Sequence, residues 1–262
     1  MNYKSFQEHE ESIKARLLKQ KGKVGFYYKN LLEETSMAYN ECELFRAASI
    51  IKLPVFIEFL RQGELGSVNL EQKIKIRKKE MVPSCGALNL FHEEPKVTIQ
   101  TLCNFMIALS DNTAANVLID LLGIEKLNRG FREFGIQKTR LERKLFDMEA
   151  AAKGLENKFM PLEIAKLFEA IYLKRLVSNK VSLKAEEILR KQQINHKIPG
   201  KLLEQIEVAH KTGEADGISN DAGIVYWEKP FVIVFASNDT DVVEFEQLIR
   251  EITYEFSIGR TY

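Results

Sequence analysis

The sequence predicts an α+β fold: an antiparallel sheet flanked by the terminal helices, with an all-helical domain inserted between its strands. Patterns typical of strands occur near both ends of the chain, whereas helical periodicity fills the middle. Amphipathic segments begin and end the sequence and are suited to cover the sheet. The 262 residues, 45% of them hydrophobic, are enough for one large domain or two coupled ones.

The N-terminal part predicts a helix, a hairpin and a second helix. The stretches GKVGFYYKN at 22–30 and TSMAYN at 35–40 are typical of two strands joined as a hairpin by LLEE. A helix is expected from Ser49 to about Arg61, ending near Gly63. The first helix of the chain is predicted by one apolar stripe at helical spacing: Phe6, Ile13, Leu17 and Leu18.

The middle of the chain is predicted to be helical, with two irregular segments. Residues 64–97 include the helix breakers Pro83, Gly86 and Pro95 and show no clean period, so we expect irregular structure there. Thr98 is a good N-cap for the apolar run that follows it. Residues 136–160 predict a long loop, and loops of that length are usually functional or disordered. Four further helices are expected at 112–121, 124–134, 161–174 and 182–192.

The C-terminal part predicts three strands, at 204–213, 218–227 and 230–238, and a final helix, DVVEFEQLIREITYEF. The simplest architecture pairs the strands from both ends of the chain in one sheet. Residues 1–46 and 195–262 would then form a discontinuous α/β domain. Residues 47–194 would form an inserted all-α domain.

The charge balance limits the classes of partner. With 38 basic and 37 acidic residues the net charge is +1. The chain therefore lacks the excess of positive charge that is typical of proteins that bind nucleic acid or an anionic membrane. No apolar stretch approaches the roughly 18 residues of a membrane span, and the N-terminus lacks the pattern of a signal peptide. We expect a monomer that is cytoplasmic as written, or secreted or periplasmic if a leader has been removed.

The cysteines and histidines predict neither a metal site nor a disulfide framework. Cys42, Cys85 and Cys103 are odd in number and widely spaced, so reduced thiols, each packed as a small buried hydrophobe, are expected. The histidines lack the spacing of metal ligands. No cofactor is expected.

Ser49 and Lys52 stand three residues apart in an apolar helical run, so their side chains share a face. A serine hydroxyl is a poor nucleophile unless a base takes its proton. Burial disfavours the charged form of a lysine and lowers its pKa, so a buried Lys52 can act as that base. Alternatively, the Lys52 side chain could extend along the helix so that its ammonium reaches solvent. The pattern Ser-x-x-Lys alone often occurs by chance and does not decide between the two.

Two further segments make this pattern more specific. SDNTAAN begins at Ser110, where one helical pattern ends and another begins, although Asp111 or Asn112 could simply cap the second helix. HKTGEADG places Lys211 at the end of a predicted strand. An ordinary strand that ends in a glycine-rich turn, with no role in catalysis, would have the same pattern. The triplet S-x-x-K, S-D-N and K-T-G, in this order, resembles class A β-lactamases and penicillin-binding proteins.

The resemblance covers the chain from about Gly25 to the last helix. VTIQTLCNFMIALSDNTAANVLIDLLG resembles the helix pair around the second motif, and TRLERK the start of the omega loop. KTGEADGISNDAGIVYW resembles the strand with the third motif and the strand after it. The chain is therefore identified as a member of the class A β-lactamase-like serine hydrolases, and the fold that this implies agrees with the one predicted above.

The resemblance implies a role for each residue on the nucleophile side. Ser49 would be the acylated nucleophile, and Lys52 its base or proton relay. Ser110 would pass the proton towards the leaving nitrogen. The backbone N–H groups of Ser49 and Glu214 would form the oxyanion hole.

On the substrate side, the resemblance implies that Asn112 contacts the side-chain amide of the substrate. Lys211 and Thr212 would hold its carboxylate. Gly213 would leave room for an extended substrate beside the strand. The implied partner is a small molecule, either a β-lactam or a related ester or amide.

The sequence departs from the family pattern in the omega loop. Class A enzymes have a glutamate two residues after the loop arginine, where it activates the deacylating water, but here Leu145 follows Arg143 at that spacing. Asp147 and Glu149 could supply a base instead, or could be solvated acids on a loop or on the first turn of a helix. Asn157 replaces the aspartate that usually pairs with the arginine, so that ion pair is expected to be missing.

Three functions remain open at this point. The first is a β-lactamase-like serine hydrolase that deacylates weakly. The second is a penicillin-binding-protein-like or sensor-like protein that is acylated but hydrolyses poorly, or a cytoplasmic esterase or amidase. The third is a non-enzymatic descendant of the fold.

Overall fold

The computed structural model describes residues 6–83 and 85–258, which divide into two compact units. Unit 1 comprises residues 1–50, 159–169 and 194–262, and unit 2 comprises residues 51–158 and 170–193. The sequence-based division had placed 47–50 and 159–169 in the helical part. They belong to unit 1 because both segments contact its sheet or the strands beside it, as described below.

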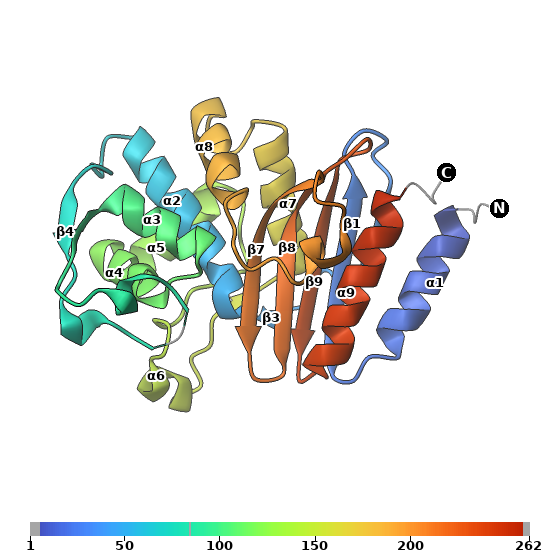
Figure 1. The fold of residues 1–262 in the computed structure, drawn as a ribbon, viewed down its shortest axis with the longest axis horizontal. Coiled ribbons are helices and arrows are strands. Elements are labelled where there is room, and N and C mark those ends of the chain that lie inside the picture. The colour runs from blue at the N-terminus through green and yellow to red at the C-terminus, as the bar shows by residue number, and fades with distance from the viewer. Residues whose placement is uncertain (1–5, 84, 259–262) are drawn as a thin grey trace. The chain divides into compact units, whose positions relative to one another are not determined.

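Unit 1 is built on a five-stranded antiparallel sheet (Figure 1). Its order, β2-β1-β9-β8-β7, places the N-terminal hairpin beside the C-terminal strands, which confirms the predicted pairing of the two ends of the chain. In the register, Tyr27 of β1 faces Val234 of β9, and Gly213 of β7 faces Asn220 of β8. The strands are β1 (Lys23–Asn30), β2 (Ser36–Tyr39), β7 (Glu207–Ala215), β8 (Ile218–Tyr226) and β9 (Phe231–Asn238).

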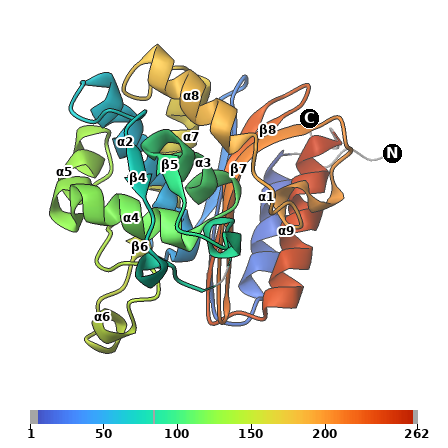
Figure 2. The same ribbon diagram turned by 60° about the vertical axis from the view of Figure 1, so that its left-hand side comes forward.

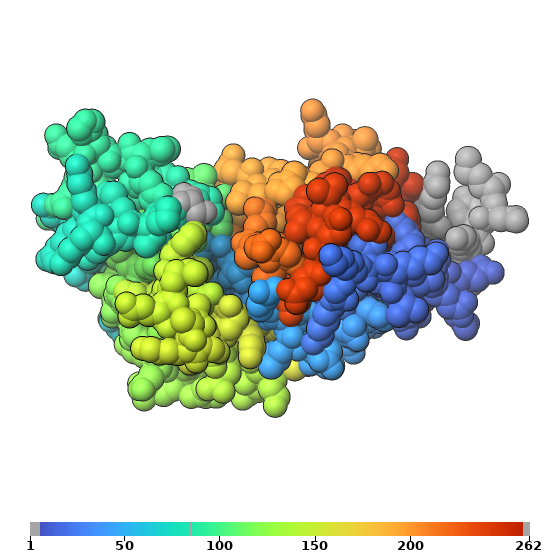
Figure 3. Space-filling model, turned by 90° about the horizontal axis from the view of Figure 1, so that it is seen from below, coloured from blue at the N-terminus to red at the C-terminus, as the bar shows by residue number. Residues whose placement is uncertain are grey.

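Helices α1 (Phe6–Leu18) and α9 (Val242–Ser257) lie side by side on one face of this sheet (Figures 2 and 3). Arg16 of α1 donates to Glu251 and Glu255 of α9, at 2.9 and 2.7 Å. Leu18 was predicted to lie on the apolar stripe of α1 but is exposed. The core between helices and sheet is formed by alternate strand residues and the inner faces of both helices, including Ile13, Leu17, Val24, Phe26, Tyr28, Ile233, Phe235, Phe245, Ile249 and Ile252.

The opposite face of the sheet packs against Phe45 and against 159–169, a segment that the sequence assigned to the helical part. A Cβ at Gly25 would lie 2.7 Å from the Phe45 ring and 3.3 Å from Pro161. Lys29 of β1 pairs with Glu169 at 2.5 Å. These contacts tie the segment 159–169 to unit 1. The elements here are β3 (Phe45–Arg46), β6 (Lys158–Phe159) and α7 (Pro161–Tyr172).

Unit 2 is organised around α2 (Lys52–Glu64), which is buried on nearly all sides because apolar residues cover its whole circumference. Its neighbour α5 approaches closely: a Cβ at Gly130 would lie 2.1 Å from the buried carboxyl of Glu58, which pairs with Arg61 at 2.7 Å. The helices that contact α2 are α3 (Ile99–Ala108), α4 (Asn112–Leu122), α5 (Ile124–Glu133) and α8 (Asn179–Leu189).

Capping side chains set the helix starts in unit 2. Thr98 accepts a hydrogen bond from Thr101 N at 3.0 Å, which confirms its predicted role, and Asp111 accepts one from Ala114 N at 2.9 Å. Ser178 caps α8, which begins three residues before its predicted start. Short elements interrupt the irregular segments: β4 (Lys73–Lys75), two 3₁₀ turns (Lys78–Glu80 and Leu88–Leu90), β5 (Lys96–Thr98) and α6 (Met148–Ala152).

Candidate active site

Ser49 lies in unit 1 on a 3₁₀ turn, Ala48–Ile51, that runs directly into α2. The sequence had predicted an α-helix from Ser49 onward. The chain instead forms a tighter turn, and its first residue, Ala48, has φ of 43°, in the left-handed region. Two asparagines of the sheet hold the chain that precedes it. Asn220 Nδ2 donates to Arg46 O at 3.0 Å, and Arg46 N donates to Asn238 Oδ1 at 3.1 Å.

Strand β7 approaches this turn so closely that only glycine fits at position 213. A Cβ at Gly213 would lie 2.9 Å from Ala47 O and 3.2 Å from Ile50 N. Unit 1 therefore brings the K-T-G segment against the peptides on both sides of Ser49. The close packing is a structural reason for this glycine, in addition to the room for substrate that the sequence suggested.

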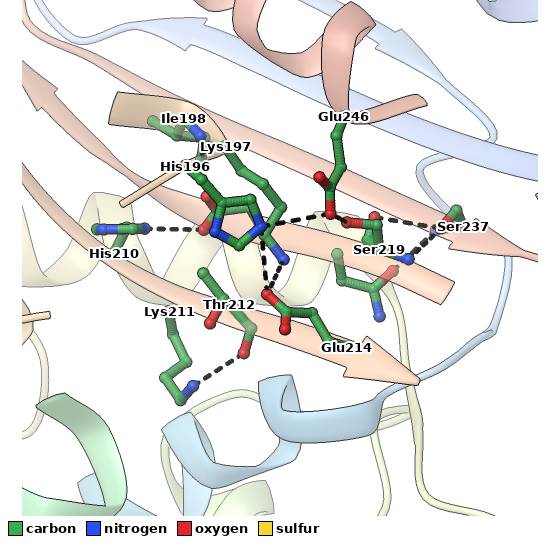
Figure 4. A network of polar contacts seen from close by, with 12 residues as sticks. His196, Lys197, Ile198, His210, Lys211, Thr212, Glu214, Ser219, Ser237 and Glu246 are labelled. Carbon is green, nitrogen blue, oxygen red and sulfur yellow. Dashed lines mark hydrogen bonds and ion pairs between the residues drawn. The ribbon is translucent and has the colours of Figure 1, made fainter. Parts of the chain in front are cut away.

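Lys211 and Thr212 are both buried on β7, which is the last strand of its sheet. Lys211 Nζ donates to Thr212 O at 2.8 Å (Figure 4). Glu214, two residues after Thr212, is exposed. Its carboxylate accepts a hydrogen bond from Lys197 Nζ at 2.9 Å.

Unit 2 brings together Lys52, Ser110 and Asn112. Lys52 Nζ donates to Ser110 O and Asn112 Oδ1, both at 2.6 Å, and to Ser110 Oγ at 3.2 Å. Burial lowers the pKa of Lys52 from 10.5 to about 8, although the nearby Cys85 and Asp111 act in the opposite direction. Lys52 does not snorkel to the surface, because its side chain is only 1% exposed.

Ser110 occupies the sharp turn between α3 and α4. Its φ of 55° is in the left-handed region, which costs a non-glycine residue about 1–3 kcal/mol. The neighbouring Asp111 holds the turn in place: its amide donates to Phe105 O at 3.1 Å, and its side chain caps α4. The backbone of this turn is therefore determined by both flanking helices.

Asp111 also anchors the loop that precedes α3. Its Oδ2 accepts from Ala87 N at 2.7 Å and Leu88 N at 2.9 Å. In the same loop, Cys85 Sγ lies 3.3 Å from Ser110 O. The prediction that the cysteines are buried is wrong for Cys85 and Cys42, which are exposed, because both stand on loops; it holds for Cys103.

The omega-like loop is closed at its neck by main-chain and side-chain contacts. Arg140 and Lys158 form an antiparallel bridge, with N···O distances of 2.9 and 3.1 Å. Asn157 Oδ1 accepts from the backbone N–H of Arg143 at 3.0 Å. Asn157 forms no ion pair with Arg143, as expected, but Arg143 Nη2 pairs with the neighbouring Glu156 at 2.9 Å, which the sequence analysis did not predict.

Inside the loop, Leu145 is fixed by one side chain of α4. Asn116 Nδ2 donates to Leu145 O, and Leu145 N donates to Asn116 Oδ1, both at 2.8 Å. Asp147 accepts from Ala150 N at 3.0 Å and so caps α6, which is the structural alternative considered for it. Glu149 is exposed in the first turn of α6.

Sequence reasoning missed a buried polar network behind β7. His210 Nδ1 lies 2.9 Å from Asp221 Oδ1, and His210 Nε2 lies 3.0 Å from Asn195 Oδ1. Asp221 Oδ2 accepts from Ile198 N at 3.0 Å, which holds the segment containing Lys197 against the sheet (Figure 4). Only the polar residues in an otherwise apolar strand pattern could have signalled it.

Over 6–83 and 85–258, no three His, Cys, Asp or Glu side chains are grouped so that they could hold a metal ion. Within the same ranges, every helix is too short or too polar to cross a membrane.

The fold defines the class: a β-lactamase-like serine hydrolase fold, as the sequence predicted. The chain belongs to the Beta-lactamase enzyme family, whose model matches residues 8–256. It is 28% identical to a β-lactamase of Rhodobacter capsulatus over 220 residues, which cover 80% of this chain and 73% of that protein. Membership supports a β-lactam hydrolase or penicillin-binding-protein-like function.

Solved structures agree with this assignment. The β-lactamase of Sphaerobacter thermophilus is 27% identical with a TM-score of 0.86, and the match covers 96% of each chain. The protein PBP-A is 25% identical with a TM-score of 0.87, over 99% of this chain and 98% of PBP-A.

Proposed function

We propose that Ser49 is acylated by a β-lactam or a related amide or ester, with Lys52 as the base. The observation that carries the proposal is the environment of Lys52: a buried amine with a pKa of about 8, held by the Ser110 and Asn112 oxygens. A continuous helical run places it one turn after Ser49.

In the proposed reaction, Ser49 Oγ attacks the carbonyl carbon of the substrate as its proton passes to Lys52. The C–N bond of the lactam then breaks, an ester forms on Ser49, and Ser110 delivers the proton to the leaving nitrogen. The backbone N–H groups of Ser49 and Glu214 stabilise the oxyanion, by roughly 3–4 kcal/mol for each donor. The contacts of Gly213 with the peptides around Ser49 support this pairing of donors.

The substrate-binding groups are assigned by the same proposal. Asn112 contacts the side-chain amide of the substrate, and Lys211 and Thr212 bind the carboxylate of a substrate that carries one. Ionic and hydrogen-bonding groups of this kind orient an acyl donor so that its carbonyl carbon faces the nucleophile.

We further propose that the acyl-enzyme is released slowly. Leu145 has no group that can accept a proton from water, and its backbone is fixed by Asn116. Asp147 is engaged as a helix cap, which leaves Glu149 as the remaining candidate base. PBP-A offers a parallel for acylation only, since a mutant of that protein has been solved as an acyl-enzyme complex with penicillin G. A penicillin-binding-protein-like function is therefore favoured over efficient hydrolysis.

Intact-protein mass spectrometry tests acylation. Penicillin G should add one covalent mass at Ser49, and Ser49→Ala should abolish the adduct. The proposal would be contradicted if penicillin G were turned over without forming an adduct that requires Ser49. It would also be contradicted if neither turnover nor an adduct were observed.

A second experiment tests release. Leu145→Glu should shorten the lifetime of the adduct by about 10²-fold or more, the usual contribution of a general base. Leu145→Gln introduces a side chain of the same shape as glutamate but without a basic group, so it should not shorten the lifetime of the adduct. A wild-type adduct that already disappears within seconds, and persists in Glu149→Gln, would show that Glu149 supplies the base.

A further inference from the structure

Glu214 places a carboxylate beside the groups proposed to bind the carboxylate of the substrate. Its side chain is 45% exposed, and Oε1 accepts from Lys197 Nζ at 2.9 Å. His196 Nε2 lies 3.6 Å from the same oxygen and 3.4 Å from Glu246 (Figure 4). Because side chains alternate along a strand, Glu214 and Thr212 point to the same face of β7.

The charges around Glu214 keep it ionised. Burial on its own raises the pKa of this carboxyl, but Lys197, His196 and Lys211 together hold the pKa below its usual value. A substrate carboxylate at Thr212 would enter a site that contains a like charge.

We propose that Glu214 is a specificity-determining residue: its carboxylate, on the same face of β7 as Thr212, repels a carboxylate bound there, so that the site favours acyl donors without a carboxylate next to Thr212. This inference rests on the proposed function. It implies that β-lactams are poorer substrates than neutral esters or amides of equal intrinsic reactivity. Repulsion between like charges is a common device for rejecting a class of ligand.

A purely structural role is the alternative. Lys197 is fully buried, and a buried ammonium needs an acceptor, which Glu214 provides. In that case neutralising Glu214 would change acylation by charged and neutral substrates to the same extent. The two roles can therefore be separated by a pair of substrates that differ only in charge.

The experiment measures second-order acylation rate constants for penicillin G and its methyl ester, which differ only at the carboxylate. Each acylation rate constant is divided by the rate constant for alkaline hydrolysis of the same compound, which corrects for intrinsic reactivity. In Glu214→Gln, which keeps an oxygen acceptor for Lys197, the ratio of penicillin G to ester should rise about tenfold. Glu246→Gln is the matched control, because Glu246 also contacts His196, and its ratio should change less than about twofold.

The outcomes separate this inference from the proposed function. If both compounds form adducts, but the ratio of their normalised acylation rates is the same in the wild type and in Glu214→Gln, the inference alone is overturned. Absence of any adduct from both compounds overturns the proposed function, and the inference falls with it. If Glu214→Gln does not fold, the wild type decides: a normalised rate for penicillin G equal to or above that of the ester overturns the inference.

Discussion

Two buried lysines, one in each unit, have opposite surroundings. Lys52 is 1% exposed and donates to carbonyl, hydroxyl and amide oxygens, and burial lowers its pKa to about 8. Lys197 is equally buried but donates to the carboxylate of Glu214. Burial alone therefore does not decide what a lysine does. A buried lysine that donates only to neutral oxygens gives up its proton more readily than one that donates to a carboxylate, because the carboxylate offsets the cost of burying the charge.

The same substitution at both lysines should have very different effects on acylation. Lys52→Met removes the proposed base and should slow acylation by penicillin G about 10²- to 10⁴-fold. Lys197→Met leaves the base in place and should slow it less than about tenfold. The rates are measured by quenched-flow mass spectrometry after thermal unfolding has shown that both variants fold. Equal losses would remove the distinction between the two lysines.

The pH dependence of acylation should follow Lys52. Its amine is the reactive form when neutral, so the rate should rise about tenfold per pH unit below its pKa and level off above it. Because burial lowers this pKa from 10.5 to about 8, the plateau should begin near pH 8. Acylation of the wild type is measured from pH 6 to 9.5 with penicillin G. A rate that still rises tenfold per unit at the upper limit would show that the base has an ordinary lysine pKa.

Glu214→Ala tests the ion pair through stability. Removing the carboxylate leaves the buried Lys197 ammonium without that acceptor, which should lower the free energy of unfolding by about 1–3 kcal/mol. Glu43→Ala, which removes an exposed partner of Lys23, is the control and should cost less than about 1 kcal/mol. Urea denaturation curves with equal slopes provide both values. Losses of the same size would mean that Lys197 does not depend on Glu214.

The sequence was informative where a pattern is local. Alternating apolar residues predicted the strands, Thr98 marked a helix start, and three short motifs located the residues around Lys52 and Lys211. The turn at Ser49 was not predicted, because its conformation depends on Asn220, which is distant in sequence. The ion pair of Arg143 with Glu156 was missed for a related reason: its geometry follows from how the loop closes. Long-range polar contacts leave no periodic signal.

Asn116 has a consequence for how such an enzyme can change over evolutionary time. Since its side chain holds the backbone of residue 145 from both sides, the loop keeps its path whichever side chain stands there. In the proposed mechanism, gain or loss of turnover would thereby be uncoupled from folding. A lineage with that mechanism could alternate between a receptor that retains its ligand and a catalyst that releases it by exchanging one side chain, without rebuilding the surrounding protein.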